Sequence, residues 1–268
     1  MLSLLSGVKI TACTLIDFCD NNMSMTEITW SEAIERAIIQ NGYIATLKEI
    51  YQIAPTFKQF AGLTPDRTIN ERVQRDKRFV KLKPGLYGLS DHLDKVPDEF
   101  NPKISKTQAD EDKITHAYIQ GMLLEVGNIN GFKTFAPDKS GRFTSRKLCD
   151  VMTLQEIPKF TFDHILHSTR FIDVIWFNEH SFPNSIFEVE NSTNFRNSLV
   201  KFVELQDFTT SMVMIAPNDK SKINKYNQEI EKSAFASIKD RVKFYNYDKI
   251  IKLYNSQIAA SKFKDFFS

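Results

Sequence analysis

The feature that most constrains this sequence is a pair of apolar segments that carry acidic residues and are separated by a turn signal. The first, residues 171–177, is interrupted by Asp173, and the second ends in Glu188 and Glu190. From Asp173 to Glu190 there are four acidic residues and no lysine or arginine, although basic residues are frequent elsewhere. The intervening Ser-Phe-Pro-Asn-Ser favours a turn, so we expect a β-hairpin that brings Asp173 alongside the two glutamates.

These three carboxylates have a predicted chemical use. Because side chains alternate along a strand, Glu188 and Glu190 are expected on the same face. Ionised carboxylates so close together repel one another unless a cation lies between them, and oxygen ligands suit Mg²⁺ or Mn²⁺ better than zinc. Such an ion activates water for attack on a phosphodiester. Asp173, Glu188 and Glu190 are therefore candidate catalytic residues and metal ligands, and the alternative is the solvated polar face of an edge hairpin.

The chain from residue 107 to 268 has the pattern of an α/β domain. Strand-like and helix-like segments alternate there, which predicts a central mixed sheet flanked by helices. A long helix, expected over 108–128, places Glu125 on the same stripe as apolar residues. Glu125 is therefore a fourth catalytic candidate, and the alternative is a helix-end carboxylate that reaches solvent.

A smaller unit is predicted over residues 26–92. Thr29, Thr46 and Thr68 are each followed three residues later by glutamate, the capping box that opens a helix, so three helices are expected. The segment Phe-Val-Lys-Leu-Lys, then Pro-Gly, then Leu-Tyr-Gly-Leu predicts a β-hairpin. Residues 93–106 hold two prolines and little periodicity, as in a linker, and residues 1–25 are expected to form a weakly ordered arm.

Basic residues gather at the end of this smaller unit. The whole chain has 35 basic and 33 acidic residues, a formal charge of +2, so a nucleic-acid site must be a local patch. Residues 67–83 hold seven basic and two acidic residues and coincide with the third helix and the hairpin. The alternative to DNA binding is a solvated helix face. The candidate DNA-binding residues are Arg67, Thr68, Asn70, Arg72, Gln74, Arg75, Lys81 and Lys83.

The smaller unit resembles a known DNA-binding module. The segments WSEAIERAIIQNG, ATLKEIY, TINERVQ and RFVKLKPGLYGL resemble winged-helix domains close to the HARE type, which accompany DNA-modifying and restriction enzymes. In helix-turn-helix proteins the recognition helix lies in the major groove, which is the role this resemblance implies for the third helix.

The larger unit resembles a nuclease superfamily. The segments HAYIQGMLLEVGNINGFKTFAPD, IDVIWF and IFEVENSTNFRNSLVKF resemble the PD-(D/E)xK nucleases in their restriction-endonuclease branch. The resemblance assigns the motif aspartate to Asp173 and the (D/E)xK pair to Glu188 and Glu190, so glutamate stands where lysine is usual. A minority of restriction enzymes carry that pattern and are active. Arg196 or Lys201 is a conceivable replacement for the missing lysine, but solvated charges are the expectation for both.

We therefore expect a sequence-specific endonuclease that cuts double-stranded DNA, of the type II restriction kind, with a winged helix that reads the site and an α/β domain that cuts with Mg²⁺ or Mn²⁺. Cutting both strands needs two catalytic centres, which predicts a homodimer. A cognate DNA methyltransferase is a further expected partner. If nuclease loops read the site instead, Lys139, Arg142 and Arg146 are the candidates.

Two other functions stay open from the sequence. A non-enzymatic DNA-binding regulator with an inactive nuclease fold is favoured by Glu190 at the lysine position, and a nuclease for modified or damaged DNA would have the same motifs. No apolar run is long enough to span a membrane, no signal peptide is recognisable, and three cysteines suggest no disulfide framework. A cytoplasmic location with no membrane partner is the expectation.

Overall fold

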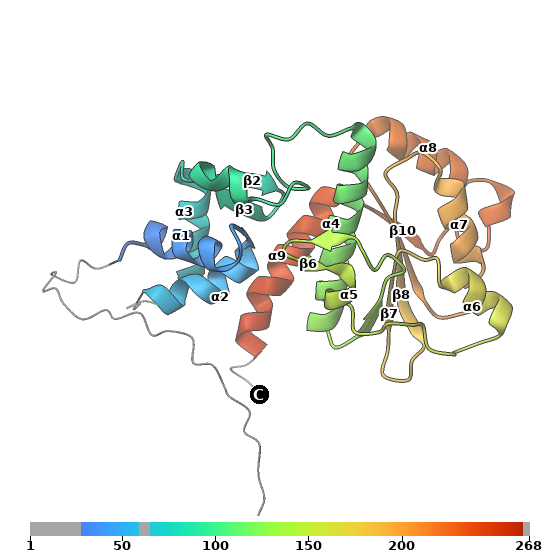
Figure 1. Ribbon diagram of the computed structural model, residues 1–268. Coiled ribbons are helices and arrows are strands. Elements are labelled where there is room, and N and C mark those ends of the chain that lie inside the picture. The colour runs from blue at the N-terminus through green and yellow to red at the C-terminus, as the bar shows by residue number, and fades with distance from the viewer. Residues whose placement is uncertain (1–27, 59–64, 265–268) are drawn as a thin grey trace, which may run out of the picture.

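The structure is a computed structural model that describes residues 28–58 and 65–264, with the backbone alone described for residues 262–264. The arm predicted over residues 1–25 lies outside this range. The chain forms a smaller helical part with a three-stranded sheet and a larger part around a five-stranded sheet, which lie side by side (Figure 1).

Three helices and a hairpin make up the smaller part, in the predicted order. Thr29 and Thr46 form complete capping boxes with the glutamates three residues on, as predicted. Gly85, between the two hairpin strands, has φ +80°, the conformation that glycine adopts readily in this turn. The elements are α1 (Trp30–Gln40), β1 (Ile44–Thr46), α2 (Leu47–Phe57), α3 (Pro65–Arg75), β2 (Phe79–Lys83) and β3 (Leu86–Leu89).

Two details of this part differ from the sequence prediction. Helix α3 begins at Pro65, so Thr68 lies inside the helix and does not cap it. Proline is favoured at the first helical position because its fixed φ suits the helix and its missing N–H is not needed there. Strand β1 was not predicted; its three residues pair antiparallel with β3.

The segment predicted as a linker is packed against the protein. It begins within a short 3₁₀ helix, η1 (Ser90–Lys95). Leu93, Val96 and Phe100 are buried in the same core as the larger part. The side chain of Asn101 is buried as well and donates to the Leu93 carbonyl at 2.7 Å. Residues 93–106 therefore connect the two parts through buried contacts.

The larger part contains the mixed sheet that the sequence predicts. Its strand order is β10-β9-β8-β7-β4, in which β4, β7 and β8 run antiparallel while β8, β9 and β10 run parallel. The strands are β4 (Lys133–Phe135), β7 (Val174–Phe177), β8 (Pro183–Val189), β9 (Ser211–Ala216) and β10 (Val242–Asn246). The predicted hairpin of β7 and β8 is confirmed.

Helices cover both faces of this sheet (Figure 1). Alternate strand residues enter two separate cores: Phe187 and Val213 pack with α4 and α9, whereas Ile186 and Met212 pack with α7 and α8. The main helices are α4 (Gln108–Ile129), α6 (Asp163–Thr169), α7 (Phe195–Val203), α8 (Lys220–Ile230) and α9 (Tyr247–Lys264). Shorter elements complete the part: β5 (Arg142–Phe143), β6 (Arg146–Lys147), α5 (Leu148–Val151) and η2 (Ser233–Phe235).

The two parts share one core. Ile44 of β1 and Leu86 of β3 are fully buried in the cluster that also holds Tyr118 of α4 and Tyr254 of α9. The Tyr118 hydroxyl donates to the carbonyl of Pro84 in the hairpin turn at 2.9 Å. Among the described residues, no helix has the length and apolar character needed to cross a bilayer.

Candidate functional site

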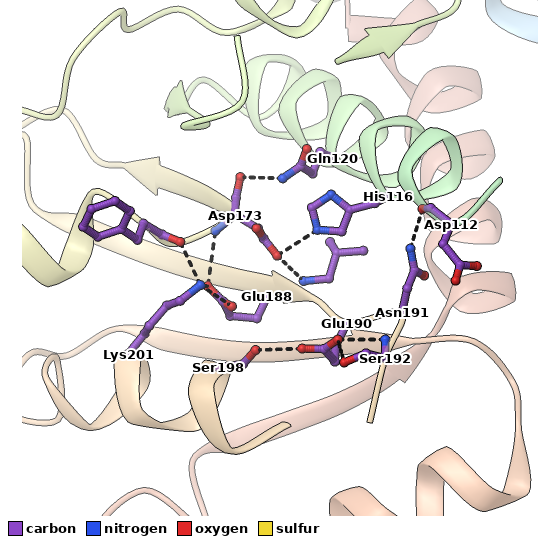
Figure 2. A network of polar contacts seen from close by, with 12 residues as sticks. Asp112, His116, Gln120, Asp173, Glu188, Glu190, Asn191, Ser192, Ser198 and Lys201 are labelled. Carbon is purple, nitrogen blue, oxygen red and sulfur yellow. Dashed lines mark hydrogen bonds and ion pairs between the residues drawn. The ribbon is translucent and has the colours of Figure 1, made fainter. Parts of the chain in front are cut away.

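Asp173 and Glu188 lie next to each other at one end of the β7–β8 hairpin (Figure 2). Asp173 directly precedes β7 and does not lie within it, which the apolar run alone could not show. Its Oδ2 atom accepts a hydrogen bond from the backbone N–H of Val189 at 2.8 Å. Its own backbone N–H donates to Oε1 of Glu188 at 3.3 Å. The hairpin thus places these two carboxylates together as predicted.

The Glu188 side chain is buried and is hydrogen-bonded to a lysine. Glu188 is 2% exposed. Burial, together with the negative charge of Asp173, raises the pKa of Glu188 to about 8. The Nζ atom of Lys201 on α7 lies 2.7 and 2.9 Å from the two carboxyl oxygens, and it also donates to the carbonyl of Phe171 at 2.8 Å. The expectation that Lys201 is a solvated charge is therefore wrong.

Glu190 is turned toward the chain that follows the strand. Its Oε1 accepts from the backbone N–H and the hydroxyl of Ser192 at 2.8 and 2.7 Å, and its Oε2 accepts from the Ser198 hydroxyl at 3.4 Å. Glu190 makes no hydrogen bond to Asp173 or Glu188 in the described structure, although all three lie in the same region (Figure 2). In residues 28–58 and 65–264, no three Asp, Glu, His or Cys side chains are arranged to hold a metal ion together.

Two polar side chains of α4 complete the surroundings of Asp173. His116 Nε2 lies 3.2 Å from Asp173 Oδ2, and Gln120 donates to the Asp173 carbonyl at 3.3 Å. Burial disfavours the charged ring, but the hydrogen bond and charge of Asp173, with Glu188 beyond it, raise the pKa of His116. Neither residue was predicted from the sequence. Their spacing of four on an otherwise apolar part of the helix is the signal that could have identified them.

Glu125 does not join this group. It lies nine residues after His116 on α4, which places it on about the opposite side of a helix with 3.6 residues per turn. Its carboxylate accepts from the Tyr254 hydroxyl at 2.6 Å, pairs with Lys48 Nζ of α2 at 3.3 Å, and also pairs with Arg146 of β6. Glu125 thus connects α4 with α2, β6 and α9 through buried contacts. This position differs from both predicted ones, a catalytic acid beside Asp173 and a solvated carboxylate at the helix end.

The predicted DNA-binding residues differ in their exposure, and Lys81 is among the exposed ones. Arg67, Arg72, Gln74 and Arg75 are exposed, and the Arg75 guanidinium pairs with Glu71 at 2.6 Å. Lys83 is turned toward α4, where it pairs with Glu111 at 2.5 Å. Thr68 and Asn70 are half-buried. Asn70, Gln74 and Lys81 line a hollow of about 470 Å³ whose other wall includes Ile251, Asn255 and Ser256 of α9.

Comparison with known proteins, rather than the fold alone, supports the class of restriction-type endonucleases. Residues 95–266 match the family described as the type II restriction enzyme NmeDI C-terminal domain. This match covers more than half of the chain, and the chain therefore belongs to that family. The matched residues include Asp173 and the side chains around it, namely His116, Gln120, Glu188, Glu190 and Lys201.

One curated relative is the type II restriction enzyme NmeDI of Neisseria meningitidis serogroup C. The two sequences are 28% identical over an alignment of 144 positions, and the alignment covers 48% of this chain and 41% of the enzyme. The matched region thus spans less than half of the length of that enzyme. No solved structure matches the chain.

Proposed function

We propose that this protein is a sequence-specific type II endonuclease of the PD-(D/E)xK kind, which hydrolyses phosphodiester bonds of double-stranded DNA with Mg²⁺. The observation that carries the proposal is the position of Lys201 on Glu188, beside Asp173, within the region that matches the restriction-enzyme family. A lysine and two carboxylates are the chemical groups that the superfamily motif supplies, although here the lysine comes from α7.

The donor set of this group fits Mg²⁺ or Mn²⁺. Asp173 and Glu188 offer oxygen ligands. Burial and then the negative charge of Asp173 raise the pKa of Glu188, and a divalent cation between the two carboxylates would lower it. Mg²⁺ commonly binds one or two carboxylates and takes its other ligands from water and substrate phosphates. The two carboxylates are thus sufficient with DNA present. When bound, such an ion activates water and stabilises charge on the phosphate oxygens.

Lys201 is proposed to take the place of the missing motif lysine. Its Nζ atom reaches the buried carboxylate although it lies thirteen residues after Glu188 in the sequence. There it offsets the negative charge of Glu188 and carries N–H groups that can orient a water or a phosphate oxygen. Arg196 does not fit this role, because its guanidinium is directed to Glu229 at 3.7 Å.

The smaller part is proposed to be a winged helix that contacts DNA. Its three helices and following hairpin have the order of that module, and Arg67 and Arg72 project from α3 into solvent. Base contacts by such side chains supply discrimination between sequences, while phosphate contacts supply affinity. A homodimer on DNA, which would provide two catalytic centres, and a cognate methyltransferase belong to the same proposal.

Cleavage of plasmid DNA by the purified chain tests the proposal. We expect Mg²⁺-dependent cutting at defined positions, mapped by run-off sequencing, and loss of cutting in Glu188→Ala with DNA binding kept. Ca²⁺ should support binding without cleavage. Binding without cleavage in Mg²⁺ or Mn²⁺ would instead indicate a non-enzymatic regulator. Cutting confined to methylated or damaged DNA would indicate a nuclease for modified DNA.

A further inference from the structure

Beside the carboxylate group there is a hollow of about 470 Å³, within the size range of about 300–1,000 Å³ that ligand pockets have. Its lining combines an aromatic ring, Phe171, with two cations, Lys139 and Arg170, and the polar side chains of Gln155 and Glu156. The side chains of Lys139 and Arg170 form no ion pair or hydrogen bond with the part of the chain that the structure describes. The hollow thus presents unpaired positive charge next to an aromatic ring.

The topology of the sheet places this hollow at the same end of β7 as Asp173. Strands β4 and β7 run antiparallel, with Phe135 opposite Ile175. The chain that leaves β4 toward Lys139 therefore emerges at the end where Phe171 and Asp173 enter β7. Phe171 also contacts the carboxylate group directly, because its carbonyl accepts a hydrogen bond at 2.8 Å from Lys201, the partner of Glu188.

Phe171 is unusual among the phenylalanines of this protein. It is 53% exposed, whereas nearly all the phenylalanines in the described residues are buried or half-buried, the exceptions being Phe162, Phe171 and Phe182. Its ring and that of His167 form a T-shaped pair with a centroid distance of 5.5 Å, and more than half of the residue's surface is still open to solvent. A phenylalanine ring in water does not contribute the stabilising free energy that its burial would give. Its exposure near Asp173 and Glu188 therefore indicates a ligand with a flat face.

We propose that Phe171, Arg170 and Lys139 form a nucleotide subsite, in which the Phe171 ring stacks on a base of the substrate strand next to the cut. This inference rests on the proposed nuclease function, because a phosphodiester must then lie at Asp173 and Glu188. Phe171 precedes Asp173 by two residues, a reach of at most about 7 Å. This separation of the two Cα atoms corresponds to about two base steps of ~3.4 Å, so we expect the ring to meet a nucleotide close to the scissile bond.

The two cations suit the phosphates that flank such a base, since phosphate contacts come mainly from arginine and lysine. Glu156 lies in the same hollow, which leaves a net positive charge. To contact the flat face of a base, the ring must enter between neighbouring bases and part their stacking, as apolar wedges do in kinked DNA. The subsite would therefore bind DNA locally opened at the cut.

Photocrosslinking of the full chain tests this contact without requiring cleavage. Mixed-sequence duplex fragments that carry 5-iododeoxyuridine are bound in Ca²⁺, irradiated, and the attached peptide is located by mass spectrometry. We expect attachment at Phe171. Bound DNA that attaches only to other residues would overturn the proposal. Phe171→Tyr should keep the attachment, and Phe171→Ala should lose it.

Binding measurements add a matched control, since Phe182 is similarly exposed, at 48%, but lies at the opposite end of the β7–β8 hairpin. We expect Phe171→Ala to weaken DNA binding about 5- to 150-fold, the factor that corresponds to ~1–3 kcal/mol of base stacking. Phe182→Ala should leave binding unchanged. Lys139→Ala should also weaken binding, whereas Lys133→Ala, at the other end of β4, should not. Equal effects within either pair would overturn the proposal.

Failure of the subsite and failure of the nuclease proposal give different results. A wild-type protein that cuts DNA with Mg²⁺, but neither attaches at Phe171 nor loses affinity in Phe171→Ala, would leave a nuclease without this subsite. A protein that attaches at Phe171 and never cuts in Mg²⁺ or Mn²⁺ would keep the nucleotide contact and lose the nuclease function. Thermal unfolding of each variant checks that the substitution has not unfolded the chain.

Discussion

Lys201 Nζ lies 2.7 Å from Oε2 of Glu188 and so joins α7 to the end of β8. The glutamate is buried, and the lysine side chain keeps about a quarter of its surface exposed, at 26%. A hydrogen bond from a cation to a buried carboxyl is costly to break, because the group left behind has no water to replace its partner. The pair thus holds an amino group at the carboxylates, although the sequence motif has glutamate at the position where the superfamily has lysine.

Replacing Lys201 by alanine should remove this amino group while leaving the DNA-contacting surfaces in place. We expect single-turnover cleavage to fall by about 10²–10³-fold, the usual loss when one preorganised donor to a charged transition state is removed. DNA binding in Ca²⁺, measured by fluorescence anisotropy, should change little. Arg196→Ala is the matched control, because that side chain pairs with Glu229 instead and should keep full activity. Undiminished cutting by Lys201→Ala would contradict the role given to this lysine.

The stability of the metal-free protein should depend on pH through Glu188. Its pKa is raised from 4.5 to about 8, first by burial and then by Asp173. Between these values the folded carboxyl keeps a proton that the unfolded chain releases, so the free energy of unfolding falls as pH rises through the window. His116 acts in the same direction, because its pKa is also raised and its stabilising charge is lost on deprotonation.

Urea denaturation in EDTA at several pH values between 5 and 8 measures this dependence. We expect Glu188→Gln to flatten the decline, since the amide does not titrate, while the part due to His116 remains. Wild-type and variant curves that stay parallel across the range would show that Glu188 has an ordinary pKa in the folded protein.

The sequence could predict what depends on neighbours in the chain. Thr29 and Thr46 cap their helices because the partner glutamate is three residues away, and Asp173 meets Glu188 because one short turn joins their strands. Lys201 comes from another element, and its position depends on how α7 packs on the sheet. A pattern of apolar residues indicates which face of a helix is buried but not which polar group it meets.

Glu125 is a second residue whose burial, but not whose partners, could be predicted from helix periodicity. Its place on the buried stripe of α4 was predicted correctly, but its partners come from α2, β6 and α9. Helix periodicity could not reveal that α2 of the smaller part and α9 would pack against this point. The buried carboxylate was therefore recognised, while its role as a connection between the two parts was not.

Glu125→Ala should accordingly affect stability more than catalysis. The change leaves Lys48, Arg146 and the Tyr254 hydroxyl without their shared acceptor. We expect the free energy of unfolding to fall by about 3 kcal/mol, the lower end of the range for a broken buried pair, because Arg146 keeps access to solvent. Cleavage at low temperature, where the variant is folded, should stay near the wild-type rate. Complete loss of cutting with unchanged stability would place Glu125 in the catalytic group after all.

Substitution of an exposed basic residue and of an ion-paired basic residue in the smaller part should have different effects on DNA binding. Arg72 is exposed on α3, so Arg72→Ala should reduce discrimination between DNA sites by about 1–3 kcal/mol if it contacts a base edge. Lys83 pairs with Glu111, so Lys83→Ala should lower stability and leave the salt dependence of DNA binding nearly unchanged. Binding isotherms at several salt concentrations measure both. A salt slope smaller by one unit in Lys83→Ala would show that Lys83 contacts phosphate.

The shared core predicts that the two parts unfold together. Phe100 of the connecting segment is 2% exposed, and its ring packs edge-on against Tyr118 of α4 at 6.4 Å. Ile44 and Leu86 of the smaller part are buried in the same core. A chain divided at residue 106 would expose these apolar surfaces, so we expect one cooperative transition with equal calorimetric and van't Hoff enthalpies.

Phe100→Ala provides the sharper test of this coupling. The lost ring should lower the free energy of unfolding by about 3–5 kcal/mol, as for other buried phenylalanines. It should also lower the temperature at which α1–α3 lose their protection from hydrogen exchange, because those helices are held through the same core. Phe182→Ala, which removes an exposed ring, is the control and should change neither quantity. Two separate calorimetric transitions, with only one of them shifted by Phe100→Ala, would show that the parts fold independently and that residues 93–106 act as a linker.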